Sequence, residues 1–346
     1  MQIELATSPK SPDADVPASS LRRMLMGYQV SQALHAVAVL GIADLLADGA
    51  HCVDELAART SAHAPTLYRL LRALASVGVF DESETQRFSL TPLSQLLQSG
   101  APNSFADLAI YAGRPYRMQA WGGLLHSVAT GENAFRHVHG TDAWSFRAHH
   151  TDEQAIFNRA MTSLSQEAAT ALLGAVDFGK FQSVADIGGG QGALLCAILA
   201  AHPSLVSTLY DQPSVAAAAE ATVMRFGVSD RCKCVGGDFF ESVPTGADAY
   251  ILRAVLHDWE DGDCIRILRS IRCAMNPDSR VLILEYLLGP PNMGGAAKFS
   301  DLNMLIGPGG RERTLGEFEA LLQCAGMRLE KALPIGQQHV IQANLG

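Results

Sequence analysis

Residues 183–192 read SVADIGGGQG, an apolar run of strand character that passes directly into closely spaced glycines. Glycine lets the backbone turn tightly and lets a ligand come close, so a strand, a glycine turn and a following helix are typical of nucleotide-binding sheet domains. The spacing is G-x-G-x-G rather than the G-x-G-x-x-G of a dinucleotide site. Asp186 would also repel a pyrophosphate. The pattern instead indicates a ligand with a cationic amino-acid end.

Strands and helices alternate from Phe178 to the end of the chain. The sequence predicts strands at 183–187, 206–210, 233–236, 249–252, 281–285, 327–333 and 339–343, with helices between them, among others at 193–201, 215–226 and 264–275. A βαβ series builds a mostly parallel sheet whose ligands bind at the carboxyl ends of the strands. We therefore predict an α/β fold with the glycine turn at that edge.

Polar residues follow the second and third predicted strands. Asp211 ends the second strand, at the position where an acid typically accepts hydrogen bonds from ribose hydroxyls. Gly237, Asp238 and Phe239 follow the third strand. Asp238 is suited to accept from an adenine amino group, and Phe239 to stack on the ring. Together with the glycine turn, these residues predict a site for an adenosine-containing ligand.

The N-terminal part has another organisation. From Val53 to Leu90 the pattern is helix, turn, helix and hairpin, the order of a winged helix, and residues 33–46 are expected to continue an apolar helix before it. Winged helices often bind DNA. Residues 51–100, however, hold four arginines, no lysine and five acids, and the hairpin tip is acidic. The pattern favours dimerisation over DNA binding.

Composition excludes several classes of protein. The 346 residues are 48% hydrophobic and 18% charged, which is incompatible with a mainly disordered chain. A net charge of −9 gives no electrostatic attraction to nucleic acid or to an anionic membrane. No apolar run is long enough to span a bilayer, and no signal peptide is evident. The seven scattered cysteines are expected to be free thiols, so we predict a cytoplasmic protein.

Five blocks carry a resemblance to a known family. They are residues 186–192, 211–213, 237–240, Leu-His-Asp-Trp at 256–259 and Gly-Arg-Glu-Arg-Thr at 310–314. In this order they resemble the S-adenosylmethionine-dependent O-methyltransferases of the plant caffeic acid and acetylserotonin type, with their bacterial natural-product branch. The resemblance extends over about residues 20–346. It implies a class I methyltransferase domain with a Rossmann-like sheet, preceded by a winged-helix dimerisation domain.

The resemblance also implies a division of the chain and its partners. Residues 1–17 are expected to form a mobile tail, 18–100 the dimerisation domain, 101–173 a helical connector lining the acceptor pocket, and 174–346 the methyltransferase domain. The implied cofactor is S-adenosylmethionine, with S-adenosylhomocysteine as product and no metal. The expected partners are a phenolic substrate and a second copy of the chain, bound through the N-terminal domain.

Methyl transfer from a sulfonium sets the requirement on the site. The leaving thioether is neutral, but a phenol with a pKa of about 10 is hardly ionised at neutral pH and needs a base. His257 follows the fourth strand at its carboxyl end. In the resembled family this histidine is the general base, and acids at the positions of Glu285 and Glu312 hold it.

Further roles are carried over position by position. The expected cofactor-binding residues are Asp186, Gly188, Gly190, Asp211, Gly237, Asp238, Phe239 and Arg253. The expected acceptor-binding residues are Phe157, Met161, Asp258, Asn303 and Met304. Two positions depart from the family pattern: Gln212 replaces a common leucine, and Arg253 replaces the lysine usual in plants. Neither change removes a group that the chemistry needs.

The sequence thus predicts O-methylation of an aromatic secondary metabolite, such as a polyketide or phenazine, by in-line displacement with His257 as base. Three alternatives stay open: a relative that keeps the cofactor for hydroxylation or decarboxylation, a winged-helix DNA-binding regulator, and methylation of a ring nitrogen. The sequence does not identify the acceptor or the position methylated.

Overall fold

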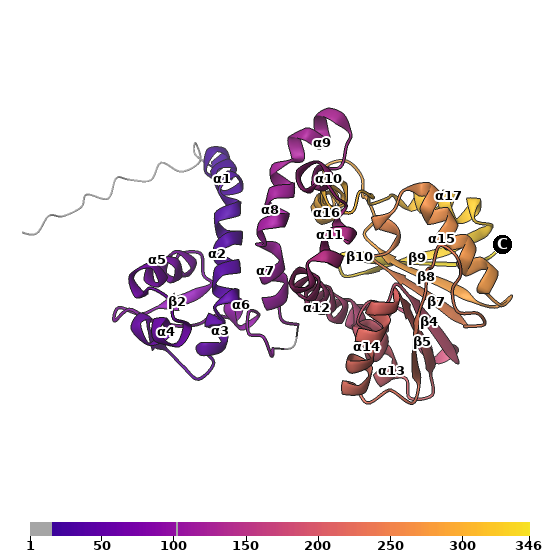
Figure 1. The fold of residues 1–346 in the computed structure, drawn as a ribbon, viewed down its shortest axis with the longest axis horizontal. Coiled ribbons are helices and arrows are strands. Elements are labelled where there is room, and N and C mark those ends of the chain that lie inside the picture. Colours follow the sequence, from indigo (N-terminus) through magenta and orange to yellow (C-terminus); the bar gives the residue numbers. More distant parts are fainter. Residues whose placement is uncertain (1–15, 102) are drawn as a thin grey trace, which may run out of the picture. The chain divides into compact units, whose positions relative to one another are not determined.

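The computed structural model describes residues 16–101 and 103–346 (Figure 1). The predicted tail therefore lies outside the described residues, except for its last two positions. The described chain forms two compact units that divide after Ala101. Among the described residues, no helix has the length and apolar character needed to cross a membrane.

The first unit is mainly helical. Its elements are α1 (Val16–Leu25), α2 (Gly27–Val39), α3 (Ile42–Leu45), β1 (His51–Cys52), α4 (Val53–Thr60), α5 (Ala64–Ala75), β2 (Phe80–Glu82), β3 (Arg87–Leu90) and α6 (Pro92–Gln95). The predicted order of helix, helix and hairpin is present. The single helix predicted for 33–46 is wrong, because Gly41 adopts a left-handed φ of 64° and separates α2 from α3.

Buried leucines and an antiparallel sheet hold this unit together. Leu67, Leu71 and Leu74 form the buried face of α5, which begins with a proline in its first turn. The strands pair in the order β1-β3-β2. Phe88 of the central strand is fully buried.

The second unit begins with six helices. They are α7 (Ala106–Ala112), α8 (Pro115–Gly122), α9 (Leu124–Thr130), α10 (Ala134–His139), α11 (Ala143–His149) and the long α12 (Thr151–Ala175). Aromatic rings join them: Tyr116 of α8 stacks on Phe146 of α11 and meets Phe135 of α10 edge to face. A short 3-10 turn at Phe178–Lys180 leads into the sheet.

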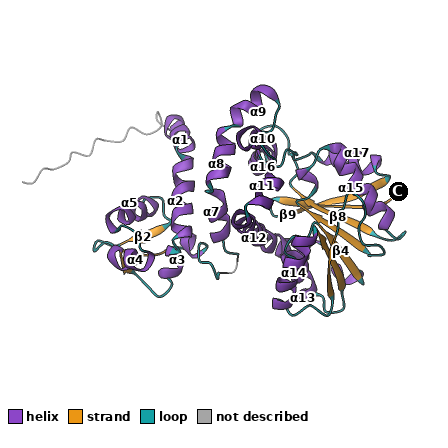
Figure 2. Ribbon diagram, viewed as in Figure 1, coloured by secondary structure: helices purple, strands orange, loops and turns teal. Residues whose placement is uncertain are grey.

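Seven strands form the sheet of the second unit (Figure 2). They are β4 (Ser183–Ile187), β5 (Val206–Asp211), β6 (Cys232–Gly236), β7 (Ala249–Arg253), β8 (Arg280–Glu285), β9 (Met327–Ile335) and β10 (Gln338–Leu345), in the order β6-β5-β4-β7-β8-β10-β9. All seven predicted strands are confirmed, most of them one or two residues longer. The first five run parallel, and β10 pairs antiparallel with both neighbours.

Helices cover both faces of this sheet. The α12, α13 (Ala193–Ala201) and α14 (Pro213–Arg225) helices contribute to one apolar cluster, and α15 (Asp261–Ala274) and α17 (Leu315–Cys324) contribute to the other. Alternate strand residues enter opposite clusters, as Ile251 and Tyr250 of β7 do. The strand order reverses around β4, so the carboxyl ends of β4, β5, β7 and β8 converge where ligands bind in such folds.

Candidate active site

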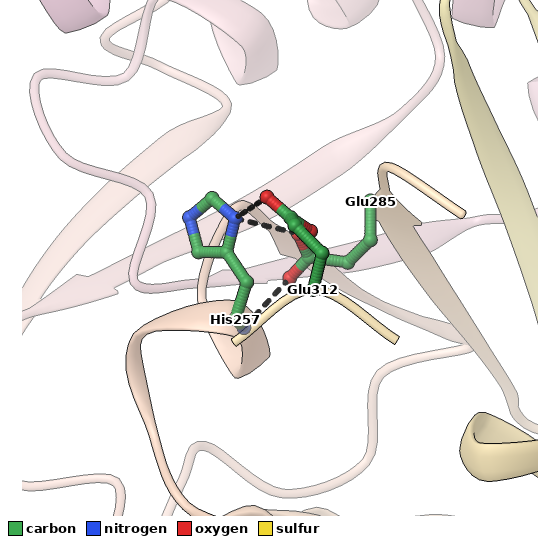
Figure 3. Close-up of side chains that lie close together, drawn as sticks. All are labelled: His257, Glu285 and Glu312. Carbon is green, nitrogen blue, oxygen red and sulfur yellow. Dashed lines mark hydrogen bonds and ion pairs between the residues drawn. The ribbon is translucent and has the colours of Figure 1, made fainter. Parts of the chain in front are cut away.

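His257, Glu285 and Glu312 meet at the carboxyl edge of the sheet (Figure 3). His257 lies in the 3-10 turn Leu256–Asp258 just after β7, and Glu285 is the last residue of the neighbouring strand β8. Glu312 comes from the segment between α16 (Gly295–Ile306) and α17. The structure therefore brings together the three predicted catalytic residues, although 55 positions separate the first from the last.

The histidine ring has a defined orientation. Its Nδ1 lies 2.9 Å from Glu312 Oε1 and 3.3 Å from Glu285 Oε2. Because carboxylates only accept hydrogen bonds, Nδ1 carries the proton and donates it to Glu312. Nε2, on the opposite side of the ring, lies 3.7 Å from Asp258 Oδ1 and makes no hydrogen bond to any described residue. In the neutral ring, Nε2 is thus a free proton acceptor.

The two carboxylates are themselves fixed by hydrogen bonds. Glu285 Oε1 accepts three backbone N–H groups, from residues 255, 256 and 257, at 3.1, 3.0 and 3.4 Å. Glu312 Oε1 accepts from Ser300 Oγ at 2.6 Å, and its backbone N–H donates to Asp301 Oδ1 at 2.9 Å. No sequence motif marks Ser300 or Asp301, so neither was predicted as part of the site.

Arg313 secures the turn that carries the histidine. Its guanidinium is fully buried and donates to the carbonyls of Leu256 and Trp259, at 3.0 and 2.7 Å. It also donates to Asp261 Oδ1 at 2.8 and 3.0 Å. In the sequence Arg313 stands among charged residues and looks like a surface arginine. In the structure it connects the Glu312 segment to the His257 turn.

The electrostatics of the cluster favour a protonated imidazole. Burial opposes the charge on His257, but the carboxylates of Glu285, Asp258 and Glu312 outweigh it and raise the pKa of His257 to about 10. Burial raises the pKa of Glu285 to about 7 and that of Asp258 to about 6, while the imidazolium pulls both down. The cluster is therefore built to hold a proton delivered to Nε2.

The raised pKa predicts an alkaline pH profile. If neutral His257 accepts the proton, the kcat/KM for the acceptor should rise about tenfold per pH unit through neutrality and level off clearly above pH 6.5, the ordinary histidine value. The measurement is initial rates from pH 6 to 10 with saturating cofactor and two acceptors of different phenol pKa. A plateau of kcat/KM already at pH 6.5 would contradict the prediction. If the pH at which the profile levels off changes with the phenol pKa of the acceptor, the titrating group is the phenol and not His257.

The predicted cofactor residues gather at the ends of β4 and β5. Asp186 in β4 is buried, and its Oδ2 has no hydrogen-bond partner. Burial, with a smaller effect of Asp211, raises the pKa of Asp186 to about 7. Asp211 ends β5, and its Oδ2 accepts from the Gly190 N–H at 2.8 Å. An unpartnered buried carboxyl beside a glycine turn fits the cationic end of an amino-acid ligand.

Close packing explains the glycines here. Gly188 has φ of 72°, and a Cβ there would approach Val255 to 2.8 Å. A Cβ on Gly237 would overlap the hydroxyl of Tyr210. At these two positions protein atoms already fill the space that a side chain would need, whereas an added Cβ on Gly190 would meet nothing within 4 Å.

The remaining cofactor residues lie on β7 and after β6. Asp238 Oδ1 accepts from the Phe240 N–H at 2.8 Å, and the Phe239 ring meets Trp259 at 6.1 Å, edge to face. Arg253 ends β7 and donates to Ser165 Oγ and to the Leu164 carbonyl, each at 2.9 Å. Arg253 also acts electrostatically on Asp186, so β7 and α12 meet beside the glycine turn.

The predicted acceptor residues come from three segments. Asp258 lies beside the His257 ring. Phe157 of α12 packs edge to face against Tyr111 and Trp144, with ring centroids 5.6 and 6.2 Å apart. The other three are partly buried on α12 and α16: Met161, Asn303 and Met304.

The donor atoms of the same cluster lie close enough to one another to share a metal ion. One donor atom each of His257, Glu285 and Glu312 lies within 4.8 Å of the others. The hydrogen bonds present in the cluster, however, keep a proton on His257 Nδ1 and fix the positions of the two carboxylates. A metal ion would have to displace the Nδ1–H donated to Glu312, so the donor set fits proton transfer better.

Known proteins resemble this chain along almost its whole length. Residues 121–328 match the family model of the O-methyltransferase domain, and residues 23–100 match the O-methyltransferase dimerisation domain. The chain is 45% identical over 320 residues to the phenazine O-methyltransferase PhzM of Lysobacter antibioticus, an alignment that covers 92% of this chain and 94% of the relative.

Solved structures agree in fold. Human N-acetylserotonin methyltransferase in complex with S-adenosylmethionine superimposes with a TM-score of 0.88 at 30% identity, covering 97% of this chain and all of that one. NcsB1, an O-methyltransferase of neocarzinostatin biosynthesis solved with S-adenosylhomocysteine and 1,4-dihydroxy-2-naphthoic acid, gives 0.77 at 32% identity, covering 92% and 96%.

Proposed function

The chain belongs to the O-methyltransferase family, and from this premise we propose that it methylates a phenolic hydroxyl of an aromatic secondary metabolite. Membership confirms the resemblance of the five sequence blocks and the predicted fold of a class I methyltransferase sheet with an N-terminal dimerisation domain. The observation that carries the proposal is the orientation of His257, whose Nδ1 is bound to a carboxylate while Nε2 stays free.

In the proposed reaction His257 is the general base. Nε2 removes the hydroxyl proton as the acceptor oxygen attacks the methyl carbon, and the imidazolium formed is stabilised by Glu312 at Nδ1 and by the nearby charges of Glu285 and Asp258. Such proton transfer contributes about 10²–10⁴-fold. Holding oxygen, carbon and sulfur in line supplies much of the remaining acceleration.

The cofactor we propose is S-adenosylmethionine, which supplies a methyl group on a sulfonium sulfur and leaves as S-adenosylhomocysteine. Asp186, with its unpartnered buried oxygen, would bind the ammonium end, and Asp211 the ribose hydroxyls. Asp238 and Phe239 would bind the adenine, and Arg253, which acts electrostatically on Asp186, would contact the cofactor. Gly190, where an added Cβ would meet nothing within 4 Å, would leave room for the ligand, and Gly188 and Gly237 would let the backbone of the site pack closely.

For the acceptor we propose a flat aromatic molecule bound among Phe157, Met161, Asp258, Asn303 and Met304. The related phenazine enzyme and the naphthoic acid bound to NcsB1 support this class. We also propose a homodimer formed through residues 18–100, in agreement with the matched dimerisation domain. Light scattering of the whole chain measures this state directly.

The same geometry bears on the alternative functions. A hydroxylating or decarboxylating relative would not need a base held by two carboxylates. A ring nitrogen that bears a proton could use the same base, so N-methylation is a variant of the proposal. The acidic hairpin, with Asp81 and Glu82 in β2, does not support DNA binding.

The testing experiment is a methyl-transfer screen in the presence of a chelator. Purified protein with S-adenosylmethionine is incubated with hydroxyphenazines, polycyclic phenols and catechols, and the products are identified by mass spectrometry. A product one methyl heavier supports the proposal, and tandem spectra assign the methyl to oxygen or nitrogen. Bound cofactor with no product across the panel would count against it.

Asp211 offers a test of the cofactor assignment. Asp211→Ala should weaken binding of S-adenosylhomocysteine by about 10- to 100-fold, because it removes charge-assisted hydrogen bonds to the ribose. Calorimetry measures the affinity. Asp177→Ala is the matched control, since Asp177 also accepts a backbone N–H, from Gly179 at 3.1 Å, but lies on an exposed turn before β4. Equal affinities of the Asp211 variant and wild type would refute the ribose assignment.

A further inference from the structure

Arg147 is a buried cation that forms no ion pair with a carboxylate of the described residues. The residue lies on α11 and is only 5% exposed. Its Nε is buried and makes no hydrogen bond, and in the described part of the chain no carboxylate oxygen lies within 4 Å of its guanidinium. Burying a charge without pairing it is costly, and proteins rarely retain such a group unless something binds it.

The guanidinium lies at an aromatic wall made up of Trp144, Phe157 and Trp259, of which Phe157 is an expected acceptor-binding residue. Its Cζ lies 4.5 Å from the ring centroid of Trp144 and 4.1 Å from that of Phe157. Trp144 in turn stacks on Trp259, with centroids 6.5 Å apart and planes within 7°. Trp259 directly follows Asp258, so the aromatic wall connects Arg147 to the His257 turn.

Electrostatics place Arg147 near the reacting end of the site. Burial raises the pKa of Asp258 to about 6, while the charges of His257 and Arg147 both pull it down. Asp258 Oδ1 is 3.7 Å from His257 Nε2. Arg147 and the proposed base therefore act on the same carboxyl.

A second unpartnered polar group lies close by. The hydroxyl of Tyr116 is buried without a hydrogen bond, and the ring of Tyr116 stacks on Phe146, the residue before Arg147. Burial raises the pKa of this hydroxyl and the Arg147 charge lowers it, so the two groups lie within electrostatic range. Glu153 is paired with Arg114, whose guanidinium donates to both of its carboxylate oxygens.

We propose that Arg147 recognises the acceptor by binding a carboxylate on its aromatic ring, so that the substrate is an aromatic hydroxy acid. This inference rests on the proposed methyl transfer and specifies its substrate class. A guanidinium matches a carboxylate with two parallel N–H donors, and the Tyr116 hydroxyl is a further donor. Contacts with the rings of Trp144 and Phe157 hold the guanidinium at the aromatic wall that leads to the His257 turn.

The test compares acceptors that differ only in the carboxylate. The pairs are 6-hydroxy-2-naphthoate with 2-naphthol and 3-hydroxybenzoate with phenol. Binding to protein loaded with S-adenosylhomocysteine is measured by calorimetry, and kcat/KM by methyl transfer. The variants are Arg147→Met, Arg147→Lys and the control Arg159→Met. Arg159 lies two residues beyond Phe157 on α12, and its exposed guanidinium is paired with Asp107.

Wild type and the Arg159 control should bind the acid of at least one pair about 10- to 100-fold more tightly than the neutral phenol, as expected for a buried charge-assisted pair. Arg147→Met should remove this preference while still binding the neutral phenol, and Arg147→Lys should retain part of it. The inference is overturned if Arg147→Met prefers the acid over the phenol as strongly as wild type does. It is also overturned if wild type shows no such preference and does not bind the acids. A preference that depends on Arg147 without methyl transfer to any acceptor would contradict the proposed function and leave the acid site standing.

Discussion

Replacing His257 with alanine should lower kcat by about 10²–10⁴-fold while the affinity for S-adenosylhomocysteine stays within about twofold of wild type. The reason is geometric: Nε2 is the imidazole nitrogen that makes no hydrogen bond to a described residue, whereas the cofactor groups lie at β4 and β5. Single-turnover methyl transfer, monitored by mass spectrometry, measures the chemical step. Calorimetry measures cofactor binding.

The substitution also removes the charge that faces buried carboxylates. Glu285 and Glu312 would lose their imidazolium partner, so the variant is expected to be less stable. This loss of stability must be distinguished from the loss of the general base. His257→Gln preserves a donor toward Glu312 without an acceptor of suitable basicity. Both variants should lose turnover alike. If His257→Gln retains wild-type turnover, His257 is not the base.

Sequence patterns specified the sheet of the second unit closely. Strands β4, β7 and β8 are largely apolar and buried, and glycine or acidic residues follow several of the strands, so the strands from Ser183 to Glu285 were located within one or two residues. Pro334 is compatible with its place in β9, because β9 is an edge strand and proline is tolerated there. The division of an apolar helix at Gly41 was missed, since a glycine inside an apolar run does not by itself indicate a left-handed turn.

The site was predictable only where the chemistry has a motif. His257 lies in a recognisable block at a strand end, and Glu285 ends the next strand, so the sheet topology alone places them together. Ser300 and Arg313 act through contacts between segments that are distant in the chain. Arg147 looks like an ordinary helical arginine until its burial is known. Tertiary contacts of this kind leave no periodic signal in the sequence.

Gly310 explains why the segment bearing Glu312 can reach the histidine. A Cβ at this position would overlap the carbonyl oxygen of His257 and the carbonyl carbon of Asp258, and would lie 2.6 Å from the Trp259 nitrogen. These are backbone atoms of the very turn that carries the proposed base. No side-chain rotation can relieve the overlap, so the two segments would have to separate.

Gly310→Ala should therefore lower kcat by about 100-fold, since displacing a catalytic group by about 1 Å can cost that much, and should destabilise the fold by about 1–3 kcal/mol through overpacking. Thermal unfolding and single-turnover rates measure the two effects. Gly316→Ala is the matched control: Gly316 lies in α17 with nothing within 4 Å of an added Cβ, and alanine favours the helix. The control should keep wild-type turnover and an equal or higher Tm. If Gly310→Ala also did so, the close approach of the two segments would not be what holds Glu312 against His257.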